Sequence, residues 1–330
     1  MTRPDTLYAK RAVRAAVREA LWASLLRHEQ GAEPNILLFA TRRGGSTFAM
    51  EIIAANRGVR PMNQPLETQS RNLTLAQALE IPRFRQGQIT SLTDTDAPQM
   101  RRLVERIFDG EIVINAPTKL WNRDVDIRSD RLVLKLTDCK PVIDWFDQTF
   151  NADIVYLTRH PIPQSLSCIR NRWTLTVDAH LQDPAFVEAH LDSTTEALAH
   201  DVMSSGDQLQ QFVLNWVLEN VAPMRLLPER PDWVHVRYED TVSNPHGVFE
   251  QLASRLRLTD RDRMEAVLSR PSQSSRRSTE ATRRDIESGQ GASTLARWQA
   301  EVGPEAIAGC DRVLDAFGID RGLLESPHQA

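Results

Sequence analysis

The turn TRRGGST at residues 41–47 contains residue types that bind an anion. Gly44 and Gly45 allow the backbone to turn sharply and to approach a ligand closely. Ser46 and Thr47 provide hydroxyl groups beside the N–H groups that are free at the start of a helix. We therefore expect this turn, here called the 41–47 loop, to bind a phosphate or a related anion.

Arg42 and Arg43 add two cations to the 41–47 loop, but the loop has no lysine. A nucleoside triphosphatase loop follows the pattern G-x-x-x-x-G-K-[ST], in which the Lys contacts the terminal phosphates. A dinucleotide-binding fold follows the pattern G-x-G-x-x-G, which is also missing. The loop therefore fits neither common class, and a βα turn that is basic by coincidence is the alternative.

Arg159 and Ser167 form a second pair of residues suited to an anion. The apolar run 153–158 predicts a strand that ends at Arg159, and a helix that begins near Pro163 carries Ser167. Ligands of open α/β sheets bind outside the carboxyl ends of the strands, so Arg159 should face the same crevice as the 41–47 loop. An Arg and a hydroxyl together suit a second phosphate.

The elements that position these residues alternate along the chain. Apolar and β-branched runs predict strands at residues 36–40, 112–115, 131–136, 153–158 and 233–238. Helical spacing of apolar residues follows at 142–146, 248–256 and 307–317. This alternation predicts an α/β fold with a central parallel sheet and helices on both faces, a three-layer sandwich. Residues 60–98 and 271–294 are expected to be loops over the site, with disorder as the alternative for the second.

Composition narrows the class of protein. The 330 residues, 41% hydrophobic and 25% charged, can build one large core or two ordinary ones. A formal net charge of −4 gives no reason to expect a nucleic-acid partner. No run approaches the roughly 18 apolar residues of a membrane span, so we expect a soluble, cytoplasmic protein. Three distant cysteines without a C-x-x-C pair argue against a disulfide framework or a cysteine zinc site.

The first part of the chain, residues 6–28, has apolar residues at helical spacing with arginines on its other faces. An organelle-targeting peptide is also amphipathic and rich in Arg. Glu19 and the regular apolar stripe favour instead a helix that docks on the domain or on a partner in a homodimer. Arginine outnumbers lysine throughout, which indicates a bacterial source; lysine occurs only at positions 10, 119, 135 and 140.

TRRGGST and IVYLTRHPIPQSLS together resemble the two cofactor motifs of the sulfotransferases that use 3′-phosphoadenosine 5′-phosphosulfate (PAPS). In that family a T-x-[RK]-[ST]-G-[ST]-T loop binds the 5′-phosphosulfate. A strand ending in V-R-D-P, with Ser eight residues after the Arg, binds the 3′-phosphate. HVRYEDTVSNP, residues 235–245, is similar to the family's R-Y-E-D-L-x-x-x-P segment, and Tyr238 takes the place of a Tyr that lines the nucleotide site in some members.

The chain departs from the family pattern at three positions. Arg42 replaces a frequent Pro, Gly44 replaces Ser or Thr, and His160 replaces the usual Asp. We expect His160 to be a structural neighbour of Arg159 rather than a catalyst.

The resemblance implies a P-loop NTPase-like sulfotransferase fold in one domain, residues 1–330, with an N-terminal helix at 1–33 and the nucleotide-binding core at 34–330. No metal is expected. Arg276 and Arg277 fall where many members fold a basic loop over the nucleotide, and a charged surface loop is the alternative. The residues that the resemblance assigns to the nucleotide are Arg42, Arg43, Gly44, Gly45, Ser46, Thr47, Arg159, Ser167, Tyr238, Arg276 and Arg277.

The resemblance also implies two catalytic cations. Arg43 occupies the place of the basic loop residue that stabilises the departing phosphate. Lys135 matches a second family lysine, because its 24-residue separation from Arg159 fits better than the 19 residues of Lys140. A surface charge at the edge of a strand is the alternative role for Lys135.

A general base must take the proton of the acceptor. No histidine lies between His28 and His160, where the phenol and steroid branch of the family would place its base. Carboxylate-based branches place a Glu shortly after the second strand, and Glu67 lies at about that point. Glu51, on the helix after the 41–47 loop, is the competing candidate.

The resulting hypothesis is a PAPS-dependent sulfotransferase that acts on a small-molecule or glycan acceptor through a hydroxyl or, less readily, an amine. Its nucleotide product is adenosine 3′,5′-bisphosphate (PAP). A P-loop-type kinase or phosphotransferase is one alternative, and a catalytically inactive nucleotide-binding relative is another. The sequence contains no motif that identifies the acceptor.

Overall fold

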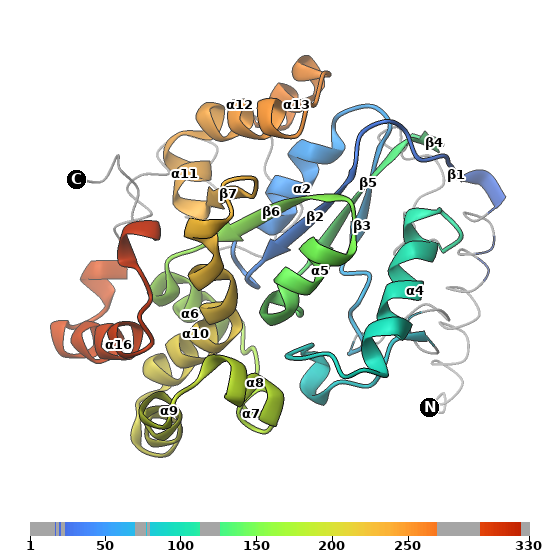
Figure 1. The fold of residues 1–330 in the computed structure, drawn as a ribbon. Coiled ribbons are helices and arrows are strands. Elements are labelled where there is room, and N and C mark those ends of the chain that lie inside the picture. Colours follow the sequence, from blue (N-terminus) through green and yellow to red (C-terminus); the bar gives the residue numbers. More distant parts are fainter. Residues whose placement is uncertain are drawn as a thin grey trace, which may run out of the picture.

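The computed structural model describes residues 17, 20, 24–69, 77, 80–112, 126–268 and 298–324. Its centre is a five-stranded sheet in the order β3-β5-β2-β6-β7, and every neighbouring pair is parallel (Figure 1). Two short strands, β1 and β4, form a separate parallel pair. The strands are β1 Arg27–His28, β2 Asn35–Ala40, β3 Val59–Asn63, β4 Arg128–Ser129, β5 Arg131–Leu136, β6 Ala152–Thr158 and β7 Val234–Arg237.

Helices connect the strands and cover the sheet. The α-helices are α2 Ser46–Ala54, α4 Asp96–Phe108, α5 Ile143–Thr149, α6 Pro161–Arg170, α7 Val177–Leu181, α8 Pro184–His190, α9 Ser193–Ser205, α10 Gln208–Leu226, α11 Tyr238–Ser243, α12 Pro245–Arg255, α13 Arg261–Leu268 and α16 Pro304–Ala316. The short 3-10 helices are η1 Arg85–Gly87, η2 Lys140–Val142, η3 Leu227–Glu229 and η5 Arg321–Leu323. None of these described helices is both long enough and apolar enough to cross a membrane.

The central strand β2 is buried along its whole length because helices pack on both of its faces. Ile36 and Leu38 belong to a core shared with α2, α12 and α13. Leu37 and Phe39 point the other way, into a core shared with α4, α5, α10 and α16. Successive side chains of a strand alternate between faces, so a strand covered on both sides must be apolar throughout. The predicted α/β fold with a central parallel sheet is confirmed.

The parallel register brings several chain segments to one edge of the sheet. Lys135, near the end of β5, lies beside Leu38 of β2 and Asn63 of β3. On the other side of β2, Ala40 pairs with Leu157 of β6. The turns that follow β2, β3, β5, β6 and β7 therefore meet at the carboxyl edge, as expected for ligand binding in this class of fold.

The predicted strands at 131–136, 153–158 and 233–238 are confirmed to within one residue at each end. The prediction that residues 60–98 are irregular was wrong at both ends: residues 60–63 belong to the edge strand β3, and residues 96–98 begin helix α4. Pro61 lies in this strand, and a Pro is tolerated at the edge of a sheet because it lacks only one backbone donor. Ile112 is not part of a strand, and the rest of the predicted strand 112–115 lies outside the described residues.

The predicted N-terminal helix lies mostly outside the described residues, as does the segment 271–294. Two members of its expected apolar stripe are described, and both are exposed: Val17 at 54% and Leu25 at 47%. Leu26 is buried instead, at 6% exposure. The described part of the stripe therefore does not pack on the core of this chain, and docking on a partner in a homodimer stays a prediction.

Candidate functional site

The 41–47 loop forms a tight turn directly before α2. The N–H of Gly44 donates to the carbonyl oxygen of Thr41 at 2.9 Å, and a Cβ at position 44 would lie 2.8 Å from that oxygen. Arg43 and Gly45 both have positive φ angles, 63° and 87°. Helix α2 begins at Ser46, so its first N–H groups point toward the carboxyl edge without acceptors inside the helix.

Tyr238 connects the 41–47 loop to Arg159. A Cβ at Gly45 would lie 2.5 Å from Cδ2 of the Tyr238 ring, so only glycine fits there. The guanidinium of Arg159 lies over the same ring, 4.2 Å from its centre. Arg159 also donates through Nη1 to the carbonyl oxygen of Arg43 at 2.7 Å. The loop after β2, the end of β6 and the start of α11 are thus in direct contact.

Arg43 brings Ser167 into the same group. Its Nε donates to the Ser167 hydroxyl at 3.2 Å, which links the loop to helix α6. Four of the residues expected at the nucleotide, Arg43, Arg159, Ser167 and Tyr238, therefore lie together. Nε of Arg159 is buried and has no hydrogen-bond partner within the described part of the chain. We call these four residues the arginine cluster.

The contacts of His160, next to Arg159, indicate a structural role. Its backbone N–H donates to the Glu239 carboxylate at 3.0 Å, and its ring stacks on Trp298 at 4.9 Å. Burial, together with the charge of Arg159, lowers the pKa of His160 to about 4. The imidazole is therefore neutral near pH 7.

Lys135 lies on the opposite side of the 41–47 loop from the arginine cluster. Its Nζ donates to the Thr47 hydroxyl at 3.4 Å, and its side chain is only 6% exposed. No carboxylate in the described part of the chain forms an ion pair with it. Burial lowers the pKa of Lys135 to about 8, although Asp138, Glu67 and Glu51 oppose the shift. The alternative of a surface charge is excluded by this burial.

Glu67 is half-buried in the turn after β3. Burial raises the pKa of its carboxyl group, the charge of Asp138 raises it further, and Arg42 and Lys135 act in the opposite direction. No described side chain donates a hydrogen bond to its carboxylate. Glu51, on α2, is also half-buried and also acts on Lys135 through its charge. Both candidate bases therefore lie near the same cation.

Arg42 and Arg43 point in different directions, because the positive φ of Arg43 turns the chain between them. Arg42 directs its guanidinium to Asp138, with Nε and Nη2 at 3.0 and 2.5 Å from one carboxylate oxygen. Gln88 donates to the same oxygen at 3.3 Å. Asp138 is 6% exposed. The Arg42 side chain is thus held away from the arginine cluster.

Lys140 forms a buried ion pair beneath the site. Its Nζ lies 2.9 Å from the carboxylate of Glu219 on α10 and donates to the carbonyl oxygen of Thr137 at 2.8 Å. Its side chain is 1% exposed. Burial opposes ionisation of Glu219, but Lys140 and Arg42 together hold the pKa of that carboxyl group below its ordinary value.

Sequence reasoning missed Asp138 and Glu219. The segment TDCK directly after β5 holds a carboxylate at the carboxyl edge between two rare lysines, and this pattern could have identified Asp138. Glu219 lies in the middle of a helix, and we find no comparable pattern around it.

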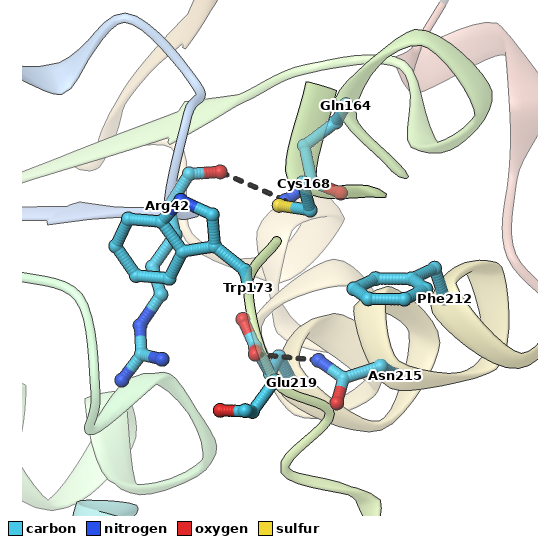
Figure 2. A pocket seen from close by; sticks show the side chains of 8 residues that line it. Arg42, Gln164, Cys168, Trp173, Phe212, Asn215 and Glu219 are labelled. Atoms are coloured by element: carbon cyan, nitrogen blue, oxygen red, sulfur yellow. Dashed lines mark hydrogen bonds between the residues drawn. The ribbon is translucent and has the colours of Figure 1, made fainter. Parts of the chain in front are cut away.

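A small cavity adjoins Arg42 on the side of α10 (Figure 2). Its volume is about 20 Å³, which is enough for about one water molecule. Figure 2 shows the Trp173 ring beside Arg42 and a hydrogen bond between Asn215 and Glu219, which measures 2.8 Å. The residues that line it are Arg42, Gln164, Cys168, Trp173, Thr174, Phe212, Asn215 and Glu219.

Arg276 and Arg277 lie outside the described residues. Within the described part of the chain, no group of three or more His, Cys, Asp or Glu side chains is arranged to hold a metal ion. Cys139, Cys168 and Cys310 are all buried free thiols.

The fold is similar to that of solved sulfotransferase structures. The sulfotransferase domain from the curacin biosynthetic pathway is 16% identical, with 91% of this chain and 100% of that chain covered and a TM-score of 0.45. The sulfotransferase domain of the Synechococcus PCC 7002 olefin synthase is 16% identical, with 88% and 97% covered and a TM-score of 0.44. Mouse sulfotransferase SULT7A1, complexed with PAP, is 14% identical, with 95% and 94% covered and a TM-score of 0.41. No family model and no curated protein matches the chain.

Proposed function

We propose that this protein transfers a sulfuryl group from PAPS to a hydroxyl group of an acceptor and releases PAP. One observation carries the proposal: two separate groups of cationic and hydroxyl side chains, each suited to an anion, lie on either side of the 41–47 loop. Lys135 and Thr47 form the first, and the arginine cluster forms the second. PAPS carries anionic groups at both its 5′ and its 3′ positions, and two such sites suit it.

The same arrangement argues against a kinase. A nucleoside triphosphate presents one chain of phosphates, which P-loop enzymes bind with a lysine in the loop and a magnesium ion. Here the lysine comes from β5, and the loop itself has none. Arg159 and Ser167, which a triphosphate would leave without a role, are the residues that the sequence motif assigns to a 3′-phosphate.

The proposed reaction is an in-line displacement at sulfur. The acceptor oxygen forms a bond to sulfur, the bond from sulfur to the 5′-phosphate oxygen breaks, and Glu67 takes the acceptor proton. Lys135 stabilises the negative charge on the departing phosphate. Arg43, which the resemblance also assigns there, directs its guanidinium to Ser167 in the arginine cluster. Preorganised donors of this kind act most strongly in a buried site, where water does not compete.

Glu67 is preferred to Glu51 as the base because of its surroundings. A base should have a pKa close to the working pH, and burial moves the pKa of Glu67 upward in that direction. Its position in the turn after β3 places it at the carboxyl edge, where the acceptor must enter. Glu51 lies on the second turn of α2, behind the 41–47 loop.

Thermal unfolding with added nucleotide tests the proposal. PAP at a hundredfold excess over its dissociation constant should stabilise the protein by about 2.7 kcal/mol. Arg159→Ala should abolish most of this stabilisation, whereas Arg101→Ala, on the exposed face of α4, should not. ATP with magnesium should stabilise the protein less than PAP does.

Three results would contradict the proposal. If millimolar PAP leaves the unfolding temperature unchanged, the protein does not use PAPS. An equal or larger shift with magnesium ATP would favour the kinase. PAP binding without transfer to any of a broad set of labelled acceptors would point to an inactive relative.

A further inference from the structure

Trp173 is an exposed aromatic side chain that the local backbone holds in place. It is 37% exposed, and it is the single aromatic among the large exposed hydrophobic side chains of the described residues. Its N–H donates to the carbonyl oxygen of Cys168 at 3.1 Å, and the N–H of Arg172 donates to Ile169 at 3.0 Å. With Arg172 at a φ of 55°, these bonds form a Schellman motif at the end of α6. The motif fixes where the Trp173 backbone lies.

One neighbour of the Trp173 ring is a cation with unused hydrogen-bonding capacity. The guanidinium carbon of Arg42 lies 5.3 Å from the ring centre (Figure 2). Asp138 holds Arg42 through Nε and Nη2. Nη1 makes no hydrogen bond within the described part of the chain, and it is not among the buried atoms that lack a partner. It is therefore open to solvent and available to an oxygen of a ligand.

Arg42 connects Trp173 to the part of the site that holds the proposed base. Asp138, which holds Arg42, is the residue whose charge acts on both Lys135 and Glu67. Arg43 points the other way, into the arginine cluster. Arg42 therefore lies close enough to the proposed base for their charges to interact, and Trp173, at the end of α6, lies against Arg42.

We infer that Trp173 and Arg42 form the acceptor-recognition wall, and that the acceptor is a neutral hydroxyl compound built on a ring. The flat face of the ring packs against the Trp173 indole, because aromatic side chains bind flat apolar faces well. An oxygen on the ring accepts a hydrogen bond from Nη1 of Arg42. Since Asp138 already neutralises Arg42, the wall favours no charge on the acceptor. This inference rests on the proposed function.

Saturation-transfer NMR on the PAP-saturated protein tests this inference with two matched pairs of probes. Phenol is compared with 1-hexanol, and methyl β-D-glucopyranoside with sorbitol. At least one ring compound should bind about tenfold more tightly than its open-chain counterpart. Preference for phenol would indicate an aryl alcohol, and preference for the glucoside would indicate a sugar.

Variants localise the effect. Trp173→Ala should weaken binding of the preferred ring compound roughly tenfold, and Trp173→Phe, which keeps an aromatic face, should restore most of it. Ile127→Ala removes another exposed apolar side chain, at 58% exposure, and serves as the matched control. Neither change should alter the stabilisation by PAP, which also shows that the variants fold.

The inference is overturned if neither ring compound binds, if the open-chain probes bind equally well, or if Trp173→Ala has no effect. In each case PAP still raises the unfolding temperature, so the proposed function survives. Failure of PAP itself to stabilise the wild-type protein is the separate result that removes the proposed function.

Discussion

Two lysines at the end of β5 lie in contrasting environments. Lys140 is 1% exposed and is bonded to the carboxylate of Glu219 at 2.9 Å and to a carbonyl oxygen at 2.8 Å. Lys135 is nearly as deeply buried, at 6% exposure, but its one described hydrogen bond is a long one to the Thr47 hydroxyl. The two ammonium groups are therefore buried to a similar extent, but within the described residues only that of Lys140 forms an ion pair.

The carboxylates near the two lysines differ in the same way. The pKa of Glu219 is lowered despite burial, because Lys140 and Arg42 stabilise its charge. The pKa of Glu67 is raised, and that of Lys135 falls to about 8, so both shift toward their neutral forms. We call Lys140 and Glu219, which form an ion pair, the tight pair, and Lys135 and Glu67, which do not, the loose pair. The charges of the tight pair are used within the fold, whereas the loose pair can still exchange a proton or stabilise the charge of a ligand.

Removing one member of the tight pair should have the largest effect. Lys140→Met leaves Glu219 buried without its cation, which should lower the free energy of unfolding by about 3–5 kcal/mol. The double variant Lys140→Met, Glu219→Met removes both charges and should recover most of that loss. Urea unfolding at pH 7 measures both. Arg101→Ala breaks the exposed pair with Glu105 and should change stability by less than about 1 kcal/mol.

The contrast between the two lysines is contradicted if Lys140→Met lowers the free energy of unfolding no more than Arg101→Ala does. In that case the Lys140 and Glu219 charges would be as well solvated as a surface pair, and the two lysines would differ less than their hydrogen bonds indicate.

Removing Lys135 should affect transfer rather than folding. Lys135→Ala should slow single-turnover transfer by a factor on the order of 10²–10³, because one preorganised donor to the departing phosphate is lost. Stability should not fall as it does for Lys140→Met, because Lys135 holds no ion pair among the described residues. A variant that unfolds but transfers normally would reverse the roles of the two lysines.

Glu67→Gln keeps the shape of the side chain and removes its ability to take a proton. Transfer should slow by roughly a hundredfold, the low end for loss of a general base. Glu51→Gln is the matched control on α2, and rapid-quench measurement with a known acceptor compares the two. Wild-type rates in Glu67→Gln combined with a slow Glu51→Gln would assign the base to Glu51.

The pH dependence of kcat/KM should show the loose pair directly. Activity should rise as Glu67 loses its proton, above the ordinary pKa of about 4.3 for a Glu, because burial raises the pKa of this group. It should fall as the pH rises through about 8, where Lys135 loses its charge. Lys135→Arg should move the alkaline limb to higher pH, since a guanidinium keeps its proton. An unchanged alkaline limb in that variant would assign the limb to another group.

Much of the architecture follows from local patterns. The runs at β5 and β6 are largely apolar because both faces of the sheet are covered, and the contact between Arg159 and the 41–47 loop follows from the parallel register. The edge strand β3 escaped prediction because two of its five residues are exposed and one of these is a Pro.

The direction of individual side chains could not be predicted in the same way. Arg42 and Arg43 are adjacent in sequence, and their divergence depends on one positive φ angle. The partner of Lys140 comes from α10, 79 residues further along the chain. Long-range contacts of this kind depend on how the helices pack, and no local pattern reports them.

The contact between Gly45 and Tyr238 limits which residues of this site can be substituted one at a time. A larger residue at position 45 would collide with the ring at 238 and would also have to adopt a φ of 87°. Tyr238 in turn supports the guanidinium of Arg159. Positions 45, 159 and 238 are therefore expected to vary together among descendants of this chain, and a library that randomises any one of them alone should return almost entirely the starting residue.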